Sequence, residues 1–278
     1  MPLFLESKNK IASPEILITG IPLDKTVCFL KGTGQSPQSL RKASWAIEDY
    51  SPPLKKSLKD KRILDKGDIN LKGSVSSSLN LIYKYACSLL KNYPNCRFVF
   101  LGGEHTLSIP LIKAFSQFYP NLNILYFDAH MDLRESFQGS KLSHACTLRR
   151  ILEIEKVRNV YILGARSGTK EEFYFKSKKL YRVPLKRKSL KVLKNRLRKN
   201  NVYVSFDFDF VDSCLLRSVS CPEGAGPDLN QTLKIIYTLR GLNIKGADFV
   251  EYNARIDKNL IDGCLCSKII REFILACL

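Results

Sequence analysis

The stretch NILYFDAHMD, residues 123–132, joins an apolar run to a group of polar side chains. Its apolar half, ILYF, is typical of a strand buried on both faces of a parallel sheet. Its second half alternates Asp128, His130 and Asp132 with Ala129 and Met131. If the strand continues, its period of two points the three polar side chains the same way. Open α/β folds place their sites at the carboxyl ends of strands, so the stretch predicts a metal site rather than a capped turn.

Apolar runs typical of buried strands alternate with helix-like segments along the rest of the chain. Further strands are expected in residues 15–23, 62–69, 97–103, 157–165, 202–210 and 244–253, and helices in 40–47, 76–92, 107–118, 143–154, 171–177, 229–240 and 260–278. This alternation predicts an α/β fold with a parallel sheet covered on both faces. The sequence shows no linker, repeat or low-complexity segment, so residues 1–278 are expected to form a single domain.

The composition is strongly basic, with 45 Lys and Arg against 26 Asp and Glu. A nucleic-acid partner must therefore be considered. The basic residues are spread, however, and their densest run, residues 176–199, is interpreted as a short strand and an amphipathic helix with a solvated face. We therefore expect no nucleic-acid partner. No apolar run is long enough to span a membrane and the first residues do not resemble a signal peptide, so no membrane partner and a cytoplasmic location are expected.

The nine cysteines are odd in number and scattered, and all are interpreted as reduced thiols. Cys28, Cys87 and Cys277 lie in apolar runs, where a cysteine behaves as a small buried hydrophobic residue. Cys264 and Cys266 are two residues apart, which is not a zinc-ribbon spacing. The cysteines therefore predict packing rather than a metal site.

Histidine is rare in this chain, and its positions favour a function. The three histidines, His105, His130 and His144, each follow the carboxyl end of a predicted strand or lie in the loop beyond it. A lone histidine is more often a core or surface residue, but three at one edge of a sheet favour a shared site. A second acidic pair, Asp207 and Asp209, lies at the end of the predicted strand in residues 202–210. These two clusters are expected to meet at that edge.

The combined set carries too much negative charge for one divalent ion. It consists of four aspartates and two histidines, namely Asp128, Asp132, Asp207, Asp209, His105 and His130. Neighbouring buried carboxylates repel strongly unless cations neutralise them. Ligands dominated by oxygen, without cysteine, favour Mn²⁺ over structural Zn²⁺. Two metals about 3.5–4 Å apart commonly activate a bridging water, so a binuclear metallohydrolase is predicted, with a phosphatase still open on these residues alone.

Four motifs identify a family resemblance. GGEH at 102–105, DAHMD at 128–132, SFDFD at 205–209 and EYN at 251–253 resemble the signatures of the ureohydrolases, which include arginase, agmatinase, guanidinobutyrase and formiminoglutamase. The resemblance covers nearly the whole chain. It implies an arginase-like, three-layer α/β/α fold with a central, mostly parallel sheet. It also implies two Mn²⁺ per chain, hydrolysis of a guanidinium to urea and an amine, and a homo-oligomer, either a trimer or a hexamer.

The resemblance assigns a role to each motif residue. One metal would be held by His105, Asp128, Asp132 and Asp207, and the other by His130, Asp128, Asp207 and Asp209. The metals would lower the pKa of a shared water, Asp132 would orient it, and Glu251 would pair with the guanidinium. On spacing alone Glu251 could instead be a surface acid beside Arg255. His144 matches the family histidine that passes a proton to the departing amine.

Two loops indicate the substrate within the family. The stretches DLRESFQGSKLSHACTLRR at 132–150 and ILGARSGTKEE at 162–172 resemble those of agmatinases. The residues with which arginases hold the carboxylate and α-amine of arginine are absent from the first stretch. The expected reaction is therefore hydrolysis of agmatine, a small cationic guanidine, to putrescine and urea in polyamine biosynthesis. Alternatives are a hydrolase of N1-aminopropylagmatine, which serves spermidine synthesis, a guanidinobutyrase and an arginase.

Several positions depart from the family pattern. Glu104 replaces the commoner Asp, and Ser213 and Ala254 each replace a usual Pro. CPEGAGPD at 221–228 also differs from the usual loop. These departures affect the rim of the site rather than the predicted ligands. All six ligand positions are retained, which argues against a non-catalytic basic binding protein on this scaffold and against the single-zinc deacetylases of the same fold.

Overall fold

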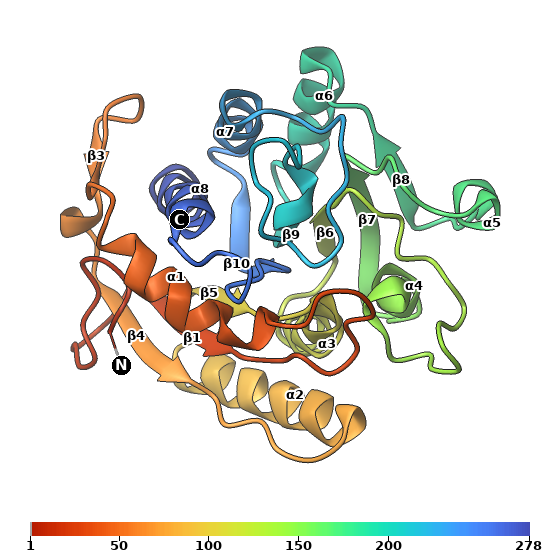
Figure 1. Ribbon diagram of the computed structural model, residues 1–278. Coiled ribbons are helices and arrows are strands. Elements are labelled where there is room, and N and C mark those ends of the chain that lie inside the picture. Colours follow the sequence, from red (N-terminus) through yellow and green to blue (C-terminus); the bar gives the residue numbers. More distant parts are fainter. Residues whose placement is uncertain (1) are drawn as a thin grey trace.

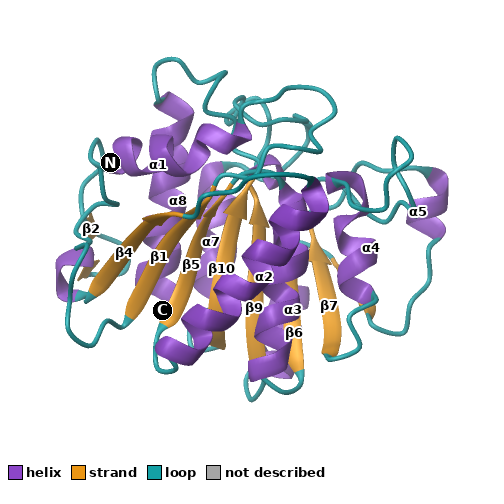
Figure 2. Cartoon of the chain, turned by 90° about the horizontal axis from the view of Figure 1, so that it is seen from below, coloured by secondary structure: helices purple, strands orange, loops and turns teal. Residues whose placement is uncertain are grey.

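The apolar runs of the sequence become the strands of one parallel sheet. The computed structural model describes residues 2–278. The sheet strands are β1 (Ile16–Ile21), β4 (Ile63–Asp68), β5 (Arg97–Gly102), β6 (Leu122–Phe127), β7 (Val157–Leu163), β8 (Leu180–Val183), β9 (Asn201–Asp207) and β10 (Asn243–Val250). They lie in the order β4-β1-β5-β10-β9-β6-β7-β8, and every neighbouring pair is parallel. All strands therefore end at the same edge, where the connecting loops gather (Figure 2).

Helices cover both faces of the sheet. They are α1 (Ser36–Ser44), α2 (Val75–Asn92), α3 (Ser108–Phe118), α4 (Thr147–Leu152), α5 (Lys170–Tyr174), α6 (Arg187–Leu197), α7 (Leu229–Thr238) and α8 (Ile261–Cys277). Apolar residues of α2, α3 and α4 pack in one core, and those of α1, α6, α7 and α8 pack in a second. Figure 1 shows α6, α7 and α8 on one side of the sheet and α2, α3 and α4 on the other. This arrangement confirms the three-layer α/β/α prediction, with a central sheet that is parallel throughout.

Short elements complete the chain. A small hairpin of β2 (Tyr50–Ser51) and β3 (Lys56–Ser57) was not expected from the sequence. The 3-10 helices are η1 (Thr33–Gln35), η2 (Leu58–Asp60), η3 (His105–Leu107), η4 (His144–Cys146) and η5 (Phe208–Phe210). Among residues 2–278, no helix is long and apolar enough to cross a membrane.

Most element boundaries agree with the sequence to within a few residues, and the differences have local causes. Helix α1 begins at Ser36, earlier than expected, with a proline in its first turn. Proline suits that position because its fixed φ is helical and its missing N–H has no partner there anyway. The predicted strand over residues 202–210 ends at Asp207, and the last three residues form η5 instead. The lysine-rich run folds as predicted, into β8 and α6.

Candidate metal centre

The register of three central strands brings the acidic motifs together. Phe127 of β6 lies opposite Phe206 of β9, so Asp128 and Asp207 follow side by side at the strand ends. Val250 of β10 lies opposite Asp207, which places Glu251 one residue beyond the same edge. Parallel pairing thus converts three sequence-distant motifs into one cluster, as the sequence predicted.

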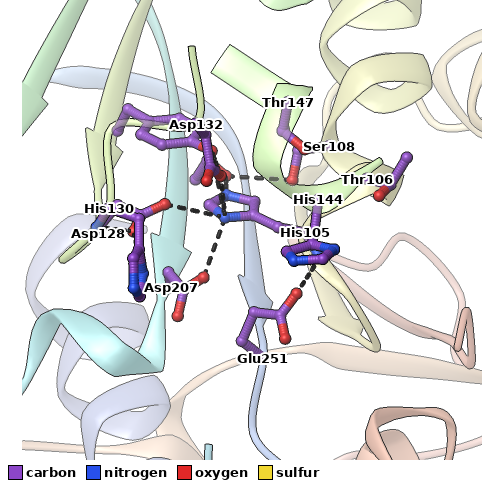
Figure 3. Close-up of polar contacts among 12 residues, drawn as sticks. His105, Thr106, Ser108, Asp128, His130, Asp132, His144, Thr147, Asp207 and Glu251 are labelled. Carbon is purple, nitrogen blue, oxygen red and sulfur yellow. Dashed lines mark hydrogen bonds and ion pairs between the residues drawn. The ribbon is translucent and has the colours of Figure 1, made fainter. Parts of the chain in front are cut away.

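His105 faces three carboxylates from the first turn after β5. Its Nδ1 lies 3.1 Å from an oxygen of Asp128, 3.0 Å from one of Asp207 and 3.6 Å from one of Asp132. Figure 3 shows these contacts converging on the imidazole ring. Because all three groups point at one nitrogen, a cation among them would be bound by the imidazole and the carboxylates together.

A chain of buried polar groups fixes the orientation of His105. Its Nε2 lies 2.9 Å from Ser205 Oγ, and Ser205 Oγ donates in turn to Asp248 at 2.7 Å. Its ring stacks on Tyr126 with 4.6 Å between centroids. If Nε2 carries the proton toward Ser205, the Nδ1 lone pair faces the carboxylates, which is how metal-binding histidines are commonly oriented. The sequence did not predict that Asp248, Ser205 and Tyr126 support this histidine. The one available signal was an acid inside the apolar strand ADFVE.

His130 joins the second half of the cluster. Its Nδ1 lies 2.7 Å from Asp209 Oδ2 and 3.6 Å from Asp128 Oδ1. The other oxygen of Asp209 accepts the Ala129 N–H at 2.9 Å. Two groups of ligand atoms in the cluster are close enough to hold an ion. One consists of His105, Asp128 and Asp132, and the other of His130, Asp128 and Asp209. The structure therefore brings all six predicted ligands together, with Asp128 common to both groups.

The convergence does not arise from a continuing strand. Strand β6 ends at Phe127, and residues 128–132 form a loop in which Asp132 has a φ of 49°. Tyr126 donates a hydrogen bond to Asp132 at 2.8 Å and holds it in the cluster. Asp209 likewise lies in η5, where its N–H is bound by the Asp207 carboxylate at 2.8 Å. The strand through residues 128–132 does not continue, and backbone turns rather than a period of two aim Asp132 and Asp209 at the cluster.

The cluster holds more buried carboxylate than its own groups neutralise. Burial first, and then repulsion from neighbouring aspartates, raises the pKa of Asp132, Asp207 and Asp209. Burial alone would lower the pKa of His105, but the neighbouring carboxylates of Asp128 and Asp207 raise that pKa well above its usual range. Asp128 Oδ2 is buried without a hydrogen-bond partner among the described residues. The cluster therefore fits divalent cations, because it holds a carboxylate oxygen without a partner, carboxylates that repel one another and two imidazoles that point at them.

A cavity of about 340 Å³ opens beside the cluster. Besides the predicted ligands, it is lined by Cys28, Met131, Arg134, Phe137, His144, Ala145, Ser167, Gly168, Thr169, Glu172, Cys221 and Glu251. Its size suits a small molecule rather than a polymer.

Glu251 is buried in this cavity, which excludes the surface position that spacing alone allowed. Its Oε1 accepts the His105 N–H at 2.6 Å, and its backbone has a φ of 66°. Burial raises its pKa to about 7, against the lowering effect of that hydrogen bond. A cation entering the cavity would favour the ionised carboxylate, so Glu251 is suited to bind a positive group.

His144 lines the same cavity but lies outside the two carboxylate groups. Its Nδ1 lies 2.9 Å from the carbonyl oxygen of Thr26, and its Nε2 lies 3.4 Å from Cys28 Sγ. Burial lowers its pKa, which keeps the imidazole neutral near pH 7. The loop that carries Thr26 is held by Glu104, whose Oε2 accepts the N–H groups of Lys25, Thr26 and Val27. Glu104 thus supports the wall of the cavity.

One expectation about the cysteines is wrong. Cys28 is exposed at the cavity, and Cys87 and Cys277 are only partly buried. Cys28 is exposed because residues 22–32 form a loop in which neighbouring side chains face different ways. Cys87 in α2 and Cys277 in α8 still pack against the edges of the two cores, as the apolar runs predicted.

Comparisons with known proteins agree with this geometry. The sequence model of the Arginase family matches residues 14–276. The chain belongs to the arginase family. It is 34% identical to the agmatinase of Bacillus anthracis over 98% of this chain and 95% of that protein. It is 35% identical to the agmatinase of Bacillus subtilis over the same shares. A crystal structure from Clostridium difficile, provisionally assigned as an agmatinase, superposes with a TM-score of 0.88 at 30% identity, over 95% of this chain and 97% of that one. The chain is an agmatinase-like ureohydrolase.

Proposed function

We propose that this ureohydrolase cleaves agmatine to putrescine and urea with the help of two Mn²⁺. The observation that carries the proposal is the cluster of four buried aspartates and two histidines beside a carboxylate-lined cavity. The agmatinases of two Bacillus species among its relatives support the substrate. The resemblance to ureohydrolases supports the reaction.

The residues that would hold the ions are those that already converge. His105, Asp128, Asp132 and Asp207 would hold one ion, and His130, Asp128, Asp207 and Asp209 the other. When bound, the ions act as Lewis acids that lower the pKa of a water and stabilise developing negative charge. An oxygen-rich ligand set with two imidazoles suits Mn²⁺.

The chain's own groups perform the remaining steps. Glu251 pairs with the guanidinium and holds its carbon against the carboxylate cluster. Asp132 accepts a hydrogen bond from the attacking water and orients it. The C–N bond to the amine then breaks, and the departing nitrogen takes up a proton. Because the Nδ1 proton of His144 is donated to the Thr26 carbonyl, Nε2 is free to take a proton released by the attacking water and to pass it to the departing nitrogen.

Selectivity must come from the part of the cavity away from Glu251, since agmatine, N1-aminopropylagmatine, 4-guanidinobutyrate and arginine all present a guanidinium. Arg134 is the cationic residue there that could bind a carboxylate. Its Nε lies 3.7 Å from Glu172 Oε2, and its guanidinium lies over the Phe137 ring at 4.8 Å. Glu172 is buried and also lines the cavity. Because Glu172 already partners Arg134, no unpaired cation of the described residues is left to bind a carboxylate at this end of the cavity, which disfavours ligands that carry one there and so favours agmatine over arginine and 4-guanidinobutyrate.

The test is urea release with added Mn²⁺ from agmatine, N1-aminopropylagmatine, 4-guanidinobutyrate and arginine. We expect kcat/KM to be highest for agmatine or its aminopropyl derivative. Agmatine and 4-guanidinobutyrate form the matched pair, because both have a four-carbon chain that ends in an ammonium in the first and in a carboxylate in the second. A higher kcat/KM for arginine that disappears in Arg134→Ala would overturn the substrate while leaving the reaction class intact.

A further inference from the structure

A second group of metal-binding side chains lies at the exposed side of the cavity. Cys28 Sγ, His144 Nε2 and Cys221 Sγ all lie within 4.8 Å of one another. Cys28 comes from the loop between β1 and η1, His144 from η4, and Cys221 from the segment between η5 and α7. All three line the cavity, and none belongs to the carboxylate cluster.

The hydrogen bonding of His144 prepares one nitrogen for a ligand. A carbonyl oxygen only accepts, so the 2.9 Å contact with Thr26 O requires the proton on Nδ1. The lone pair of Nε2 then faces Cys28 Sγ at 3.4 Å. Histidines that bind metals commonly donate their other N–H to a backbone carbonyl in this way. The Thr26 loop is itself fixed by Glu104, so the ring orientation is set before any ion binds.

The spacing and chemistry of the group fit zinc. Bonds of about 2.3 Å to sulfur and about 2.1 Å to nitrogen in a tetrahedron separate the two ligand atoms by roughly 3.6 Å, close to the observed contact. Two thiols and an imidazole are softer ligands than the aspartates nearby, so they select a different metal. We propose that Cys28, His144 and Cys221 bind one Zn²⁺ in a three-ligand site with an open fourth position.

Such a site would inhibit the enzyme. A zinc ion on Nε2 would occupy the atom with which His144 moves a proton, and it would narrow the cavity. This consequence rests on the proposed function, whereas binding of the ion does not. Burial, together with Glu251 and Cys28, raises the pKa of Cys221, so its thiol loses its proton as the ion binds.

The binding test is titration of the Mn²⁺-loaded full chain with Cd²⁺, a thiophilic probe whose bonds to thiolates absorb in the ultraviolet. We expect one equivalent per chain to produce the thiolate absorption, and Zn²⁺ to displace it. Cys28→Ser and Cys221→Ser should each weaken binding by on the order of 10²-fold or more. Cys214→Ser is the matched control, because Cys214 is an exposed thiol in the same segment as Cys221 but outside the group. Cadmium absorption that persists in Cys28→Ser and Cys221→Ser overturns the site.

The functional test is inhibition of urea release by Zn²⁺, with each variant compared with its own zinc-free rate. The unaltered chain and Cys214→Ser should be inhibited alike, and Cys28→Ser and Cys221→Ser should resist. Equal inhibition of all four, with release of Mn²⁺, would mean that zinc enters the carboxylate cluster and would overturn the regulatory role. A Cys28–Cys221 disulfide, with no Cd²⁺ binding after reduction, would overturn the site. One equivalent of Cd²⁺ bound by a chain that hydrolyses no guanidine would overturn the proposed function and leave this site standing.

Discussion

Two clusters of buried charge lie on the same sheet, one at the edge strand β4 and one at the ends of the central strands β6 and β9, and only in the first is the fully buried carboxylate paired with a cation of the chain. Arg41 of α1 is fully buried, and its Nε and Nη2 lie 2.7 and 2.8 Å from the two oxygens of Asp65. Its Nη1 also donates to Asp68. The guanidinium thus binds two acids of β4. The carboxylate cluster at the ends of β6 and β9 has four aspartates, and among residues 2–278 no arginine or lysine donates to their carboxylates; Arg166 reaches only the backbone carbonyl of Asp209, at 2.9 Å.

Comparison of the two clusters shows which kind of buried charge indicates a metal site. Breaking a buried ion pair leaves an uncompensated charge, so the Arg41 cluster holds α1 on β4 and needs nothing further. In the carboxylate cluster, burial and repulsion between aspartates raise the pKa of Asp132, Asp207 and Asp209. The charge that neutralises these acids must therefore come from outside the protein. Surplus charge, rather than burial of charge, therefore marks the candidate metal centre.

Removal of the shared aspartate should have the largest effect. Asp128 belongs to both groups of ligand atoms, so Asp128→Ala is expected to lose both ions together. Loss of Lewis-acid stabilisation worth several kcal/mol should lower kcat by on the order of 10⁴-fold or more. Metal analysis beside a urea-release assay measures both effects. Retention of two ions by the variant, or a single tightly held zinc in the unaltered chain, contradicts the binuclear manganese site.

A change beside the cluster, but outside it, should separate chemistry from metal binding. His144→Ala should keep both metals and nearly the same KM, because His144 is not among the carboxylate groups. It should lower kcat by on the order of 10²–10⁴-fold, the usual contribution of a general acid. Steady-state kinetics on the metal-loaded variant tests this. An unchanged kcat removes His144 from the mechanism.

Mutation of the Arg41 cluster should change the stability of the protein but not its metal binding. Arg41→Ala leaves Asp65 buried without its partner, so the free energy of unfolding should fall by about 3–5 kcal/mol. Denaturant unfolding of the metal-free protein measures it. The double variant Arg41→Met with Asp65→Leu is the control, and it should recover part of the loss because the fully buried charge of Asp65 is gone, although Asp68 loses its partner and the Phe4 N–H loses its acceptor. Loss of bound metal from folded Arg41→Ala would contradict the expectation that the Arg41 cluster contributes to stability alone.

Metal removal should give the smallest effect, and this effect should depend on the carboxylate cluster rather than on the Arg41 cluster. Free Mn²⁺ at ten times the dissociation constant of each site stabilises the folded state by about 1.4 kcal/mol per ion, and two ions therefore by about 2.8 kcal/mol. At roughly 2–4 °C per kcal/mol for a chain of this class, chelation should lower Tm by about 5–10 °C. Thermal unfolding with and without chelator should show this shift in the unaltered chain and in Arg41→Ala, but not in Asp128→Ala. A chelator shift that survives in Asp128→Ala would place the stabilising ions elsewhere.

Much of the fold and of the site could be predicted because the signals are local. Apolar runs of strand length, separated by helical periodicity, predicted seven of the sheet strands and the amphipathic run that folds into β8 and α6. The six ligand candidates follow the ends of those strands, and parallel strands end at one edge. The hairpin of β2 and β3 could not be predicted, because its two short strands lie on either side of a Pro-Pro pair and carry no alternating pattern.

The sequence by itself determined which side chains meet at the sheet edge, since residue type and position at the end of a strand are read from one segment at a time. Only the tertiary structure decided how they are aimed. Asp132 and Asp209 reach the cluster through backbone turns, and Glu251 is buried because β10 pairs with β9. Cys28 and Cys221 meet His144 across three separate loops. Such contacts depend on the paths of several loops over one another, and no periodicity within a single loop records them.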